Sequence, residues 1–385
     1  MQGSGQPDVS AIAERARAAG RLGLDTEFMP EGRYRPLLCL VQISAGEQVD
    51  VLDPLAGFDP APLAAVLADP TVEVVVHAGR QDVAILRREW SIDFTNVFDT
   101  QVAAGFAGSS AQAGYNGLLH DVLRIRLPKT ASFTRWDARP LTDEQLRYAR
   151  GDVEHLMPLA DEIRRRLEAR GRLEWAREEC RAIANATDER DPDEVWRRLP
   201  RVTGLDPRER AVARELAAWR ERTAAKEDRP VGAVLRDPTV VELAKRQPEG
   251  RRELSQIRGV NPDVIRRRGD DVIAVIARGR EAEPIRTDDS ERLNTEAQDG
   301  PVIALAESLV RARAQEAGLA YELIAARADL SPIVVSARRG GAEPDVRTLR
   351  GWRRELVGAE LLELLKGGRR LGVGPGGRID VQSVE

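Results

Sequence analysis

Two acidic residues, Asp25 and Glu27, stand two positions apart inside the apolar segment 21–28, which is a predicted strand. Side chains alternate across a strand, so both carboxylates share one face. Burying two unpaired carboxylates is costly, and a divalent cation bound between them removes that cost. The pair therefore suggests a metal site, although an exposed Asp-x-Glu also occurs by chance in many proteins.

Three further residues extend this chemistry. Asp82 follows the predicted strand 72–77 and falls in the first turn of the next predicted helix, where an acidic residue is favourable in any case. Tyr148 and Asp152 are four residues apart on a predicted helix and so share one face, where a simple hydrogen bond between them is the competing explanation. Together the four carboxylates match the needs of phosphodiester hydrolysis by two metals roughly 3.5–4 Å apart. Mg²⁺ and Mn²⁺ prefer such oxygen ligands.

The segments that must position these residues predict a mixed α/β domain in the first half of the chain. Three strands in succession are followed by alternating strands and helices, which predicts a mixed sheet with helices on both faces. Thr142 and Gln145 form a predicted capping box at the start of one long helix. The predicted strands are 21–28, 37–44, 48–52, 72–77 and 97–99, and the predicted helices are 60–68, 81–89, 142–170 and 173–186.

The second half of the 385-residue chain is predicted to be all helical. Its first part, 206–280, holds 18 Lys/Arg and 13 Asp/Glu, a balance of +5 in a chain whose net charge is −4. An acidic connector and a second helical part, 302–366, follow, and the Gly-rich end is interpreted as a flexible tail. The predicted boundaries are 1–200, 201–282, 283–300 for the connector, 301–370, and 371–385 for the tail.

Cellular location and redox state follow from what the sequence lacks. No apolar stretch reaches the roughly 18 residues that span a bilayer, and residues 1–10 have no apolar core for a signal peptide. We therefore expect a cytoplasmic protein that does not enter membranes. Cys39 and Cys180 are expected to be free, buried thiols.

Four local strings resemble the ribonuclease D family, in the tyrosine-bearing branch of the DEDD exonuclease superfamily. They are Leu-Asp-Thr-Glu-Phe (24–28), His-Ala-Gly-Arg-Gln-Asp (77–82), Phe-Asp-Thr (98–100) and the segment 139–153. The resemblance implies a ribonuclease H-like fold and a 3′→5′ exoribonuclease that releases 5′-mononucleotides. It also implies two divalent cations, Mg²⁺ or Mn²⁺.

The same resemblance implies a role for each residue. Asp25 would contact both metals, Glu27 and Asp152 the one nearer the nucleophile, and Asp82 the other, partly through waters. Tyr148 would orient the attacking water, because a phenol with a pKa near 10 is a poor base. The implied partner is RNA with a free 3′ end, with tRNA precursors suggested, and the implied state is a monomer. DNA remains an alternative substrate; a non-catalytic RNA-binding scaffold fits less well with the intact set of five residues.

Substrate contacts are predicted in the loop 128–140, where Lys129, Arg135 and Arg139 surround Trp136 and Phe133. These cations would pair with phosphates and the rings would stack on bases; alternatively, the aromatics pack onto the long helix. Two residues beside the acidic motifs, Phe28 and His77, are added as candidate substrate contacts. A core histidine is the simpler interpretation of His77.

Both helical parts also resemble known modules. Residues 206–280 resemble an HRDC domain in the strings 216–224, 229–237, 241–248, 254–260 and 266–273. Arg266, Arg267 and Arg268 are its candidate phosphate contacts, unless the module is only a spacer. Residues 302–366 resemble the second, more divergent HRDC-like module of ribonuclease D proteins, with Trp352-Arg353-Arg354 as the comparable element.

Overall fold

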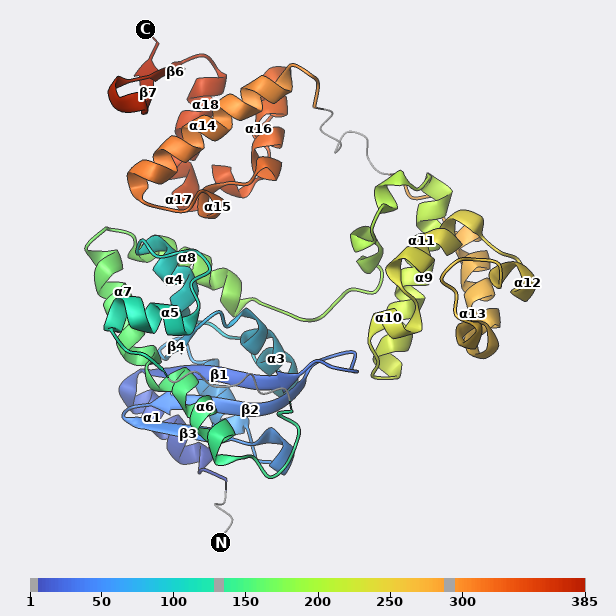
Figure 1. The fold of residues 1–385 in the computed structure, drawn as a ribbon, viewed down its shortest axis with the longest axis horizontal. Helices are drawn as coiled ribbons and strands as arrows, with labels where there is room; N and C mark the ends of the chain where they lie inside the picture. The colour runs from blue at the N-terminus through green and yellow to red at the C-terminus, as the bar shows by residue number, and fades with distance from the viewer. Residues whose placement is uncertain (1–5, 128–134, 287–294, 385) are drawn as a thin grey trace.

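The computed structural model describes residues 6–127, 135–286 and 295–384. Its N-terminal part is built on a five-stranded sheet of order β3-β2-β1-β4-β5 (Figure 1). The first three strands form an antiparallel meander, and the last two run parallel to β1. The mixed sheet predicted from the sequence is therefore confirmed. The strands are β1 (Arg21–Met29), β2 (Leu37–Ala45), β3 (Gln48–Leu52), β4 (Glu73–Val76) and β5 (Val97–Asp99).

Helices cover both faces of the sheet. One face packs against α1 (Val9–Ala19), α2 (Ala61–Leu67) and α3 (Arg80–Trp90) through a core that includes Leu22, Leu24 and Ile43. The other face carries α6 (Asp143–Glu154) and α7 (Leu156–Glu168), with α4 (Thr100–Phe106), α5 (Tyr115–Leu118) and α8 (Leu173–Ala184) beyond them.

Helix α1 was not among the predicted helices, although the sequence carries its signals. Asp8 caps the helix by accepting hydrogen bonds from the backbone N–H groups of Ser10 and Ala11. Val9, Ile12, Ala13 and Ala16 are buried, which is the spacing of one helix face. The residues before Asp8 are polar and contain Gly, which is a composition typical of a loop.

The single helix predicted over 142–170 is wrong, because the structure divides it into α6 and α7 at His155. Pro158 explains the break. Proline has no N–H to donate to the carbonyl of Glu154, and its ring clashes with that carbonyl in a continuous helix. The capping box of Thr142 and Gln145 at the start of α6 is confirmed.

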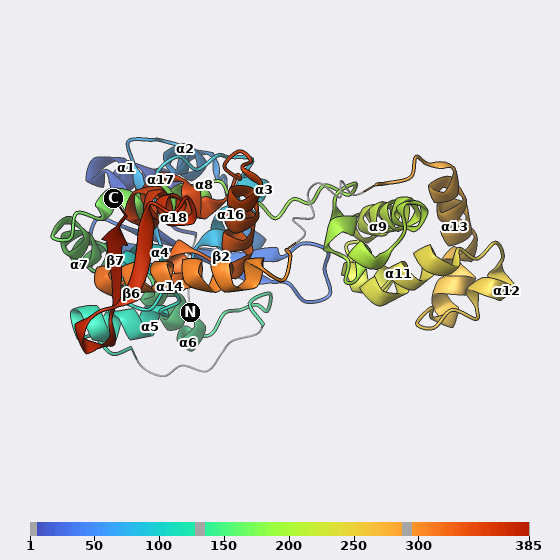
Figure 2. The same ribbon diagram turned by 90° about the horizontal axis from the view of Figure 1, so that it is seen from above.

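The middle module is an all-helical bundle with its own core, set to one side of the rest (Figures 1 and 2). This core includes Trp196 and Leu199, so the module begins before the predicted boundary at 201. Ile285, beyond the predicted end at 282, also packs against it. Its helices are α9 (Pro207–Lys226), α10 (Val231–Val234), α11 (Asp237–Arg246), α12 (Arg251–Leu254) and α13 (Pro262–Glu281).

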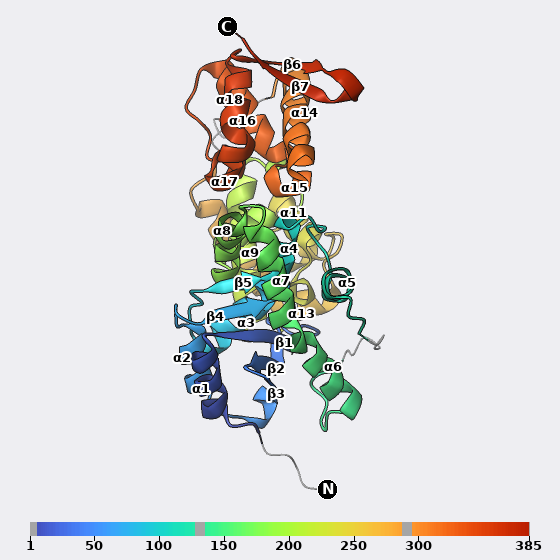
Figure 3. The ribbon, with the colours of Figure 1, turned by 90° about the vertical axis from the view of Figure 1, so that its left-hand side faces the viewer.

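The C-terminal helices return to the N-terminal part and share one hydrophobic core with it (Figure 3). Trp352 lies between Phe106 and Trp175, with ring centroids 5.0 Å and 5.3 Å away. Its indole N–H donates to Glu179 at 2.9 Å, and Arg353 donates to the same carboxylate at 2.6 Å and 2.9 Å. The helices are α14 (Asp299–Ala317), α15 (Tyr321–Ile324), α16 (Arg327–Arg339), α17 (Gly351–Arg353) and α18 (Ala359–Leu365).

The chain ends in a two-stranded antiparallel hairpin, so the flexible tail predicted for 371–385 is wrong. Strand β6 (Arg369–Val373) pairs with β7 (Ile379–Ser383). Leu371 and Val381 face each other across the pair and pack against the shared core. This alternation of apolar and polar residues was visible in the sequence, but the glycines between the strands concealed it; Gly376 and Gly377 form the turn with φ of +77° and +74°.

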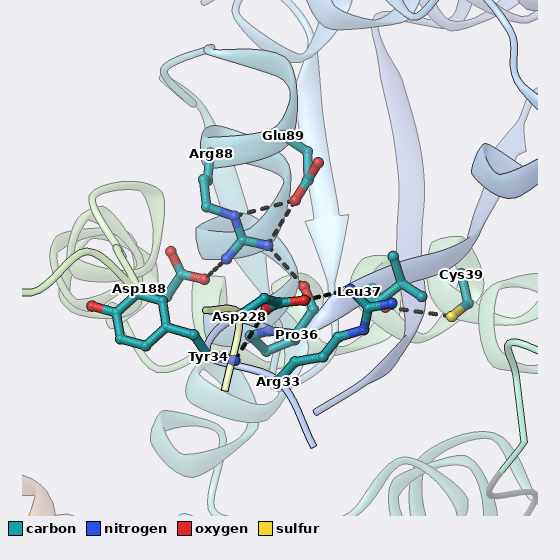
Figure 4. Close-up of polar contacts among 9 residues, drawn as sticks. All are labelled: Arg33, Tyr34, Pro36, Leu37, Cys39, Arg88, Glu89, Asp188 and Asp228. Atoms are coloured by element: carbon teal, nitrogen blue, oxygen red, sulfur yellow. Dashed lines mark hydrogen bonds and ion pairs between the residues drawn. The ribbon is translucent and has the colours of Figure 1, made fainter. Parts of the chain in front are cut away.

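The loop between β1 and β2 reaches the middle module (Figure 4). The Arg33 guanidinium pairs with Asp228 at 2.8 Å, and the backbone N–H of Tyr34 donates to the same carboxylate at 3.2 Å. The Tyr34 hydroxyl donates to Glu221 of α9 at 3.0 Å. The strand that carries the two acidic residues is therefore linked directly to the middle module. No described helix is long and apolar enough to cross a membrane.

Candidate active site

The acidic residues lie where β1 runs past the end of β4. Only residues 21–23 of β1 pair with β4, so Asp25 and Glu27 come after the last of these pairs. On the other side they pair with Gln42 and Leu40 of β2, and a β-bulge follows immediately after Glu27. Bulges are frequent next to active sites because they redirect side chains.

Helix α6 supplies the third carboxylate. Ala149 and Gln145 are buried against the sheet, and this packing fixes the face of α6 that carries Tyr148 and Asp152. Carboxylate oxygens of Asp25, Glu27 and Asp152 all lie within 4.8 Å of one another. Three oxygens this close suit a single divalent cation as their common partner.

Asp82 lies beside this group but approaches from the other side of β1. It stands in the first turn of α3, and its carboxylate accepts a hydrogen bond from the Thr26 hydroxyl. Thr26 points to the opposite face of the strand from its two acidic neighbours. The charge of Asp82 nevertheless raises the pKa of both Asp25 and Glu27, so all four carboxylates interact.

Burial and mutual repulsion disfavour the charged forms of the four groups. Desolvation, followed by the charges of Asp152 and Asp82, raises the pKa of Glu27 to about 8. Desolvation also raises the pKa of Asp152 to about 7, and it raises the pKa of Asp25 and Asp82. Across the described ranges, none of the four forms an ion pair with Lys or Arg. This donor set fits divalent cations, which would supply the missing positive charge.

Tyr148 is placed to donate a hydrogen bond toward this cluster. Its hydroxyl bonds to the Asp152 carboxylate, and burial together with the nearby carboxylates raises the pKa of the phenol. Its ring packs beside Trp136, with centroids 6.0 Å apart. A phenol with a raised pKa stays protonated at neutral pH, so Tyr148 is suited to orienting a water rather than to removing its proton.

Two of the predicted substrate residues have structural roles instead. Trp136 is 4% exposed and packs on Tyr148, so the packing alternative is correct for this ring. Arg139 donates to the two carboxylate oxygens of Asp53 from Nε and from one terminal nitrogen, each at 2.6 Å. The same terminal nitrogen donates to the backbone carbonyl of Cys39 at 3.1 Å. Arg135 is exposed and pairs with Asp137 at 2.9 Å. Lys129 and Phe133 lie outside the described residues.

Most of the other candidate substrate contacts also have partners within the protein. His77 Nδ1 lies 2.9 Å from the Thr100 hydroxyl, and desolvation lowers the pKa of His77 to about 4, as expected for a neutral core histidine. Phe28 is partly buried and packs against the core that includes Leu22, Leu24 and Ile43. In the middle module, Arg266 pairs with Asp263 at 2.6 Å and Arg268 with Glu227 at 2.5 Å, whereas Arg267 is exposed.

Two polar residues near the site were not predicted to have a role there. Gln42 is fully buried directly across from Asp25, and neither of its amide atoms has a hydrogen-bond partner in the part of the chain that the structure describes. A glutamine inside the apolar run 36–43 was the available signal. Asp99, at the end of β5, is fully buried and bonded to several backbone N–H groups. Both cysteines are free and buried, as expected.

This fold and site define an exonuclease with an appended HRDC domain. A family model described as 3′-5′ exonuclease matches residues 4–168, and an HRDC domain model matches residues 209–276. The chain is 35% identical to ribonuclease D of Acidiphilium cryptum, over 97% of this chain and 94% of that protein. It is 36% identical to ribonuclease D of Gluconacetobacter diazotrophicus, over 95% and 93%.

The crystal structure of Escherichia coli RNase D, described as an exoribonuclease involved in structured RNA processing, superimposes with a TM-score of 0.83 at 28% identity. That match covers 93% of this chain and 96% of the other. The chain belongs to the ribonuclease D family. The fold class and the enzyme class expected from the sequence are confirmed.

Proposed function

We propose that this exoribonuclease of the ribonuclease D family cleaves RNA at its 3′ end with Asp25, Glu27, Asp82, Tyr148 and Asp152, and releases 5′-mononucleotides. The observation that carries the assignment is the convergence of three carboxylates within 4.8 Å, with Tyr148 bonded to one of them. The ions that fit this oxygen-only set are Mg²⁺ or Mn²⁺.

Bound divalent cations would supply charge neutralisation and an acidified water for the hydrolysis. The chain itself holds the reacting groups in position. Asp25 and Glu27 are held in register by the strand pairs with β2, and Asp152 is held by α6. The Tyr148 hydroxyl, which bonds to Asp152, would fix the direction of a nucleophilic oxygen next to that carboxylate. Its raised pKa supports this orienting role.

The middle module would hold the RNA away from the cut. Five cations (Arg201, Arg236, Lys245, Arg246 and Arg258) line a groove of about 790 Å³ together with one acidic residue, Glu242. Apart from Arg246, which pairs with Glu242, these cations form no ion pair with any residue that the structure describes. Unpaired cations on one face attract phosphates. We therefore assign this groove, rather than Arg266 and Arg268, as the main phosphate-binding surface of the module.

Structured RNA, with tRNA precursors as the specific candidate, is the substrate that best fits this combination of a 3′-end site and a distant basic surface. A DNA substrate is the alternative. The monomeric state and the cytoplasmic location stay predictions.

The decisive experiment uses a hairpin RNA with a 3′ tail, the matched DNA, and a circular RNA of the same composition. We expect cleavage of the tailed RNA with Mg²⁺ or Mn²⁺, release of 5′-mononucleotides, and no cleavage with EDTA. Asp25→Asn and Asp152→Asn should each lower turnover by several orders of magnitude, whereas the exposed Asp93→Asn should not. Full activity in EDTA, or rapid cutting of the circle, would refute the proposal; preference for DNA would favour the alternative.

A further inference from the structure

Asp99 ties together two segments that are distant in the sequence. Its carboxylate accepts hydrogen bonds from the backbone N–H groups of Gln101 at 2.8 Å and Val102 at 3.2 Å, which cap α4. The same carboxylate accepts hydrogen bonds from Ala78 at 3.1 Å and Gly79 at 2.9 Å, in the turn between β4 and α3. A helix cap requires only the first two bonds. The second two need another explanation.

The turn that Asp99 holds has a backbone conformation that is costly without support. Ala78 has φ of +53°, in the left-handed region that residues with a Cβ rarely adopt. At Gly79 an added Cβ would lie 2.5 Å from Cβ of Val76, so the chain passes too close for any side chain. Such conformations persist where surrounding bonds over-determine them, and they cluster at functional sites.

Thr100 adds to the same support. Its hydroxyl donates to the backbone carbonyl of Val76 at 3.0 Å and lies 2.9 Å from His77 Nδ1. The two residues that end β5 and begin α4 therefore fix residues 76–79 by side-chain bonds on both sides of the turn. The first turn of α3 follows directly, and it carries Asp82.

We propose that Asp99 is a positioning residue for the metal site, acting through the strained turn to set where Asp82 stands relative to Asp25. This inference rests on the proposed function for the identity of the site. It assigns to Asp99 no contact with substrate or metal. Partners that orient a metal ligand change metal affinity by about 10- to 100-fold when they are lost.

The variant Asp99→Asn tests this positioning role, because the asparagine side chain has nearly the same shape as that of aspartate. One acceptor oxygen becomes an NH₂ group, which cannot accept a bond from a backbone N–H. Ala78 and Gly79 bond to different oxygens of Asp99, so the turn loses a bond whichever oxygen is replaced. The matched control is Asp8→Asn, because Asp8 also caps a helix with two N–H bonds but has no link to Asp82. Adding Ala78→Gly to Asp99→Asn should recover part of the lost affinity, since glycine adopts positive φ freely.

The measurement is Mn²⁺ binding by calorimetry and the Mn²⁺-induced rise in Tm of the full chain, together with the Mn²⁺ concentration for half-maximal cleavage of tailed RNA. We expect Asp99→Asn to weaken Mn²⁺ binding about 10-fold or more and Asp8→Asn to leave it unchanged. Unchanged Mn²⁺ affinity in folded Asp99→Asn would overturn the proposal, as would an equal loss in Asp8→Asn.

If Asp99→Asn does not fold, Thr100→Val takes its place, because it removes the bonds to Val76 and His77; unaltered Mn²⁺ affinity there also overturns the proposal. Failure of the proposed function would look different. The wild-type chain would then bind Mn²⁺ without cleaving RNA, and the calorimetric comparison of the variants would still stand.

Discussion

Removing the metal should make the stability of this protein fall as the pH rises above neutrality. Burial raises the pKa of Glu27 from 4.5 to about 8 and that of Asp152 from 3.8 to about 7. An acid with a raised pKa in the folded state keeps its proton longer there than in the unfolded chain. Stability is therefore lost as the pH rises from the unfolded pKa to the folded one.

The size of the loss can be worked out above pH 6.5. Below that value His77 acts in the opposite direction. Folding lowers its pKa from 6.5 to about 4, so the stability contributed by His77 increases as the pH rises between these two values. Between pH 6.5 and 8 only the acidic groups contribute to the change. Each pKa unit is worth about 1.4 kcal/mol, so Glu27 alone accounts for a loss of about 2 kcal/mol, or roughly 2–4 °C in Tm for a chain of this size.

The assay is thermal unfolding in EDTA and in excess Mg²⁺ at both pH values. We expect Tm to fall with pH in EDTA and to fall much less with Mg²⁺, which takes the place of the protons. The control is Glu27→Gln, which should have a smaller pH dependence in EDTA because the contribution of Glu27 is removed. An equal Tm at the two pH values in EDTA, or an undiminished pH dependence in Glu27→Gln, would refute this account of the electrostatics.

Three further predictions concern catalysis, binding and packing. Tyr148→Phe should lower kcat about 10- to 100-fold with little change in KM, since only the orientation of the nucleophile is lost; steady-state kinetics on tailed RNA would contradict this if KM alone changed. Replacing Arg236, Lys245 and Arg258 with Gln should flatten the decrease of RNA affinity with salt, measured on inactive Asp25→Asn protein, and an unchanged slope would favour the spacer interpretation of the module. Trp352→Ala should lower the free energy of unfolding by about 3–5 kcal/mol in urea titrations, whereas a loss below about 1 kcal/mol would mean that its packing against Phe106 and Trp175 contributes little.

Much of the site could be predicted because its local signals are strong. Asp25 and Glu27 sit on an alternating strand, and Tyr148 and Asp152 are one helical turn apart on a helix with a clear capping box. The spatial meeting of these elements is set by sheet order, which local patterns do not encode. The role of Asp99 was therefore hidden, since its four partners come from two distant segments.

The surroundings of Arg139 and Trp136 could not be predicted for a related reason. Arg139 and Trp136 stand in a polar loop, and their type and spacing fit a nucleic-acid surface. Asp53, 86 residues away, pairs with Arg139 in the fold, and Tyr148 covers Trp136. Ion pairing between distant residues depends on tertiary structure, so composition alone cannot separate a free arginine from a paired one.

The N-terminal part and the C-terminal helices share one core, and this has a consequence for synthesis of the chain. The middle module has its own core, complete once Ile285 has been made, so it can fold on the ribosome as a unit. The faces of Phe106 and Trp175 that pack against Trp352 stay exposed until α14 to α18 emerge. Trp352 is made after the middle module, so the part of the enzyme that cleaves RNA completes its packing later than that module does. We expect a nascent chain stalled before α14 to carry a folded middle module and an unfinished nuclease.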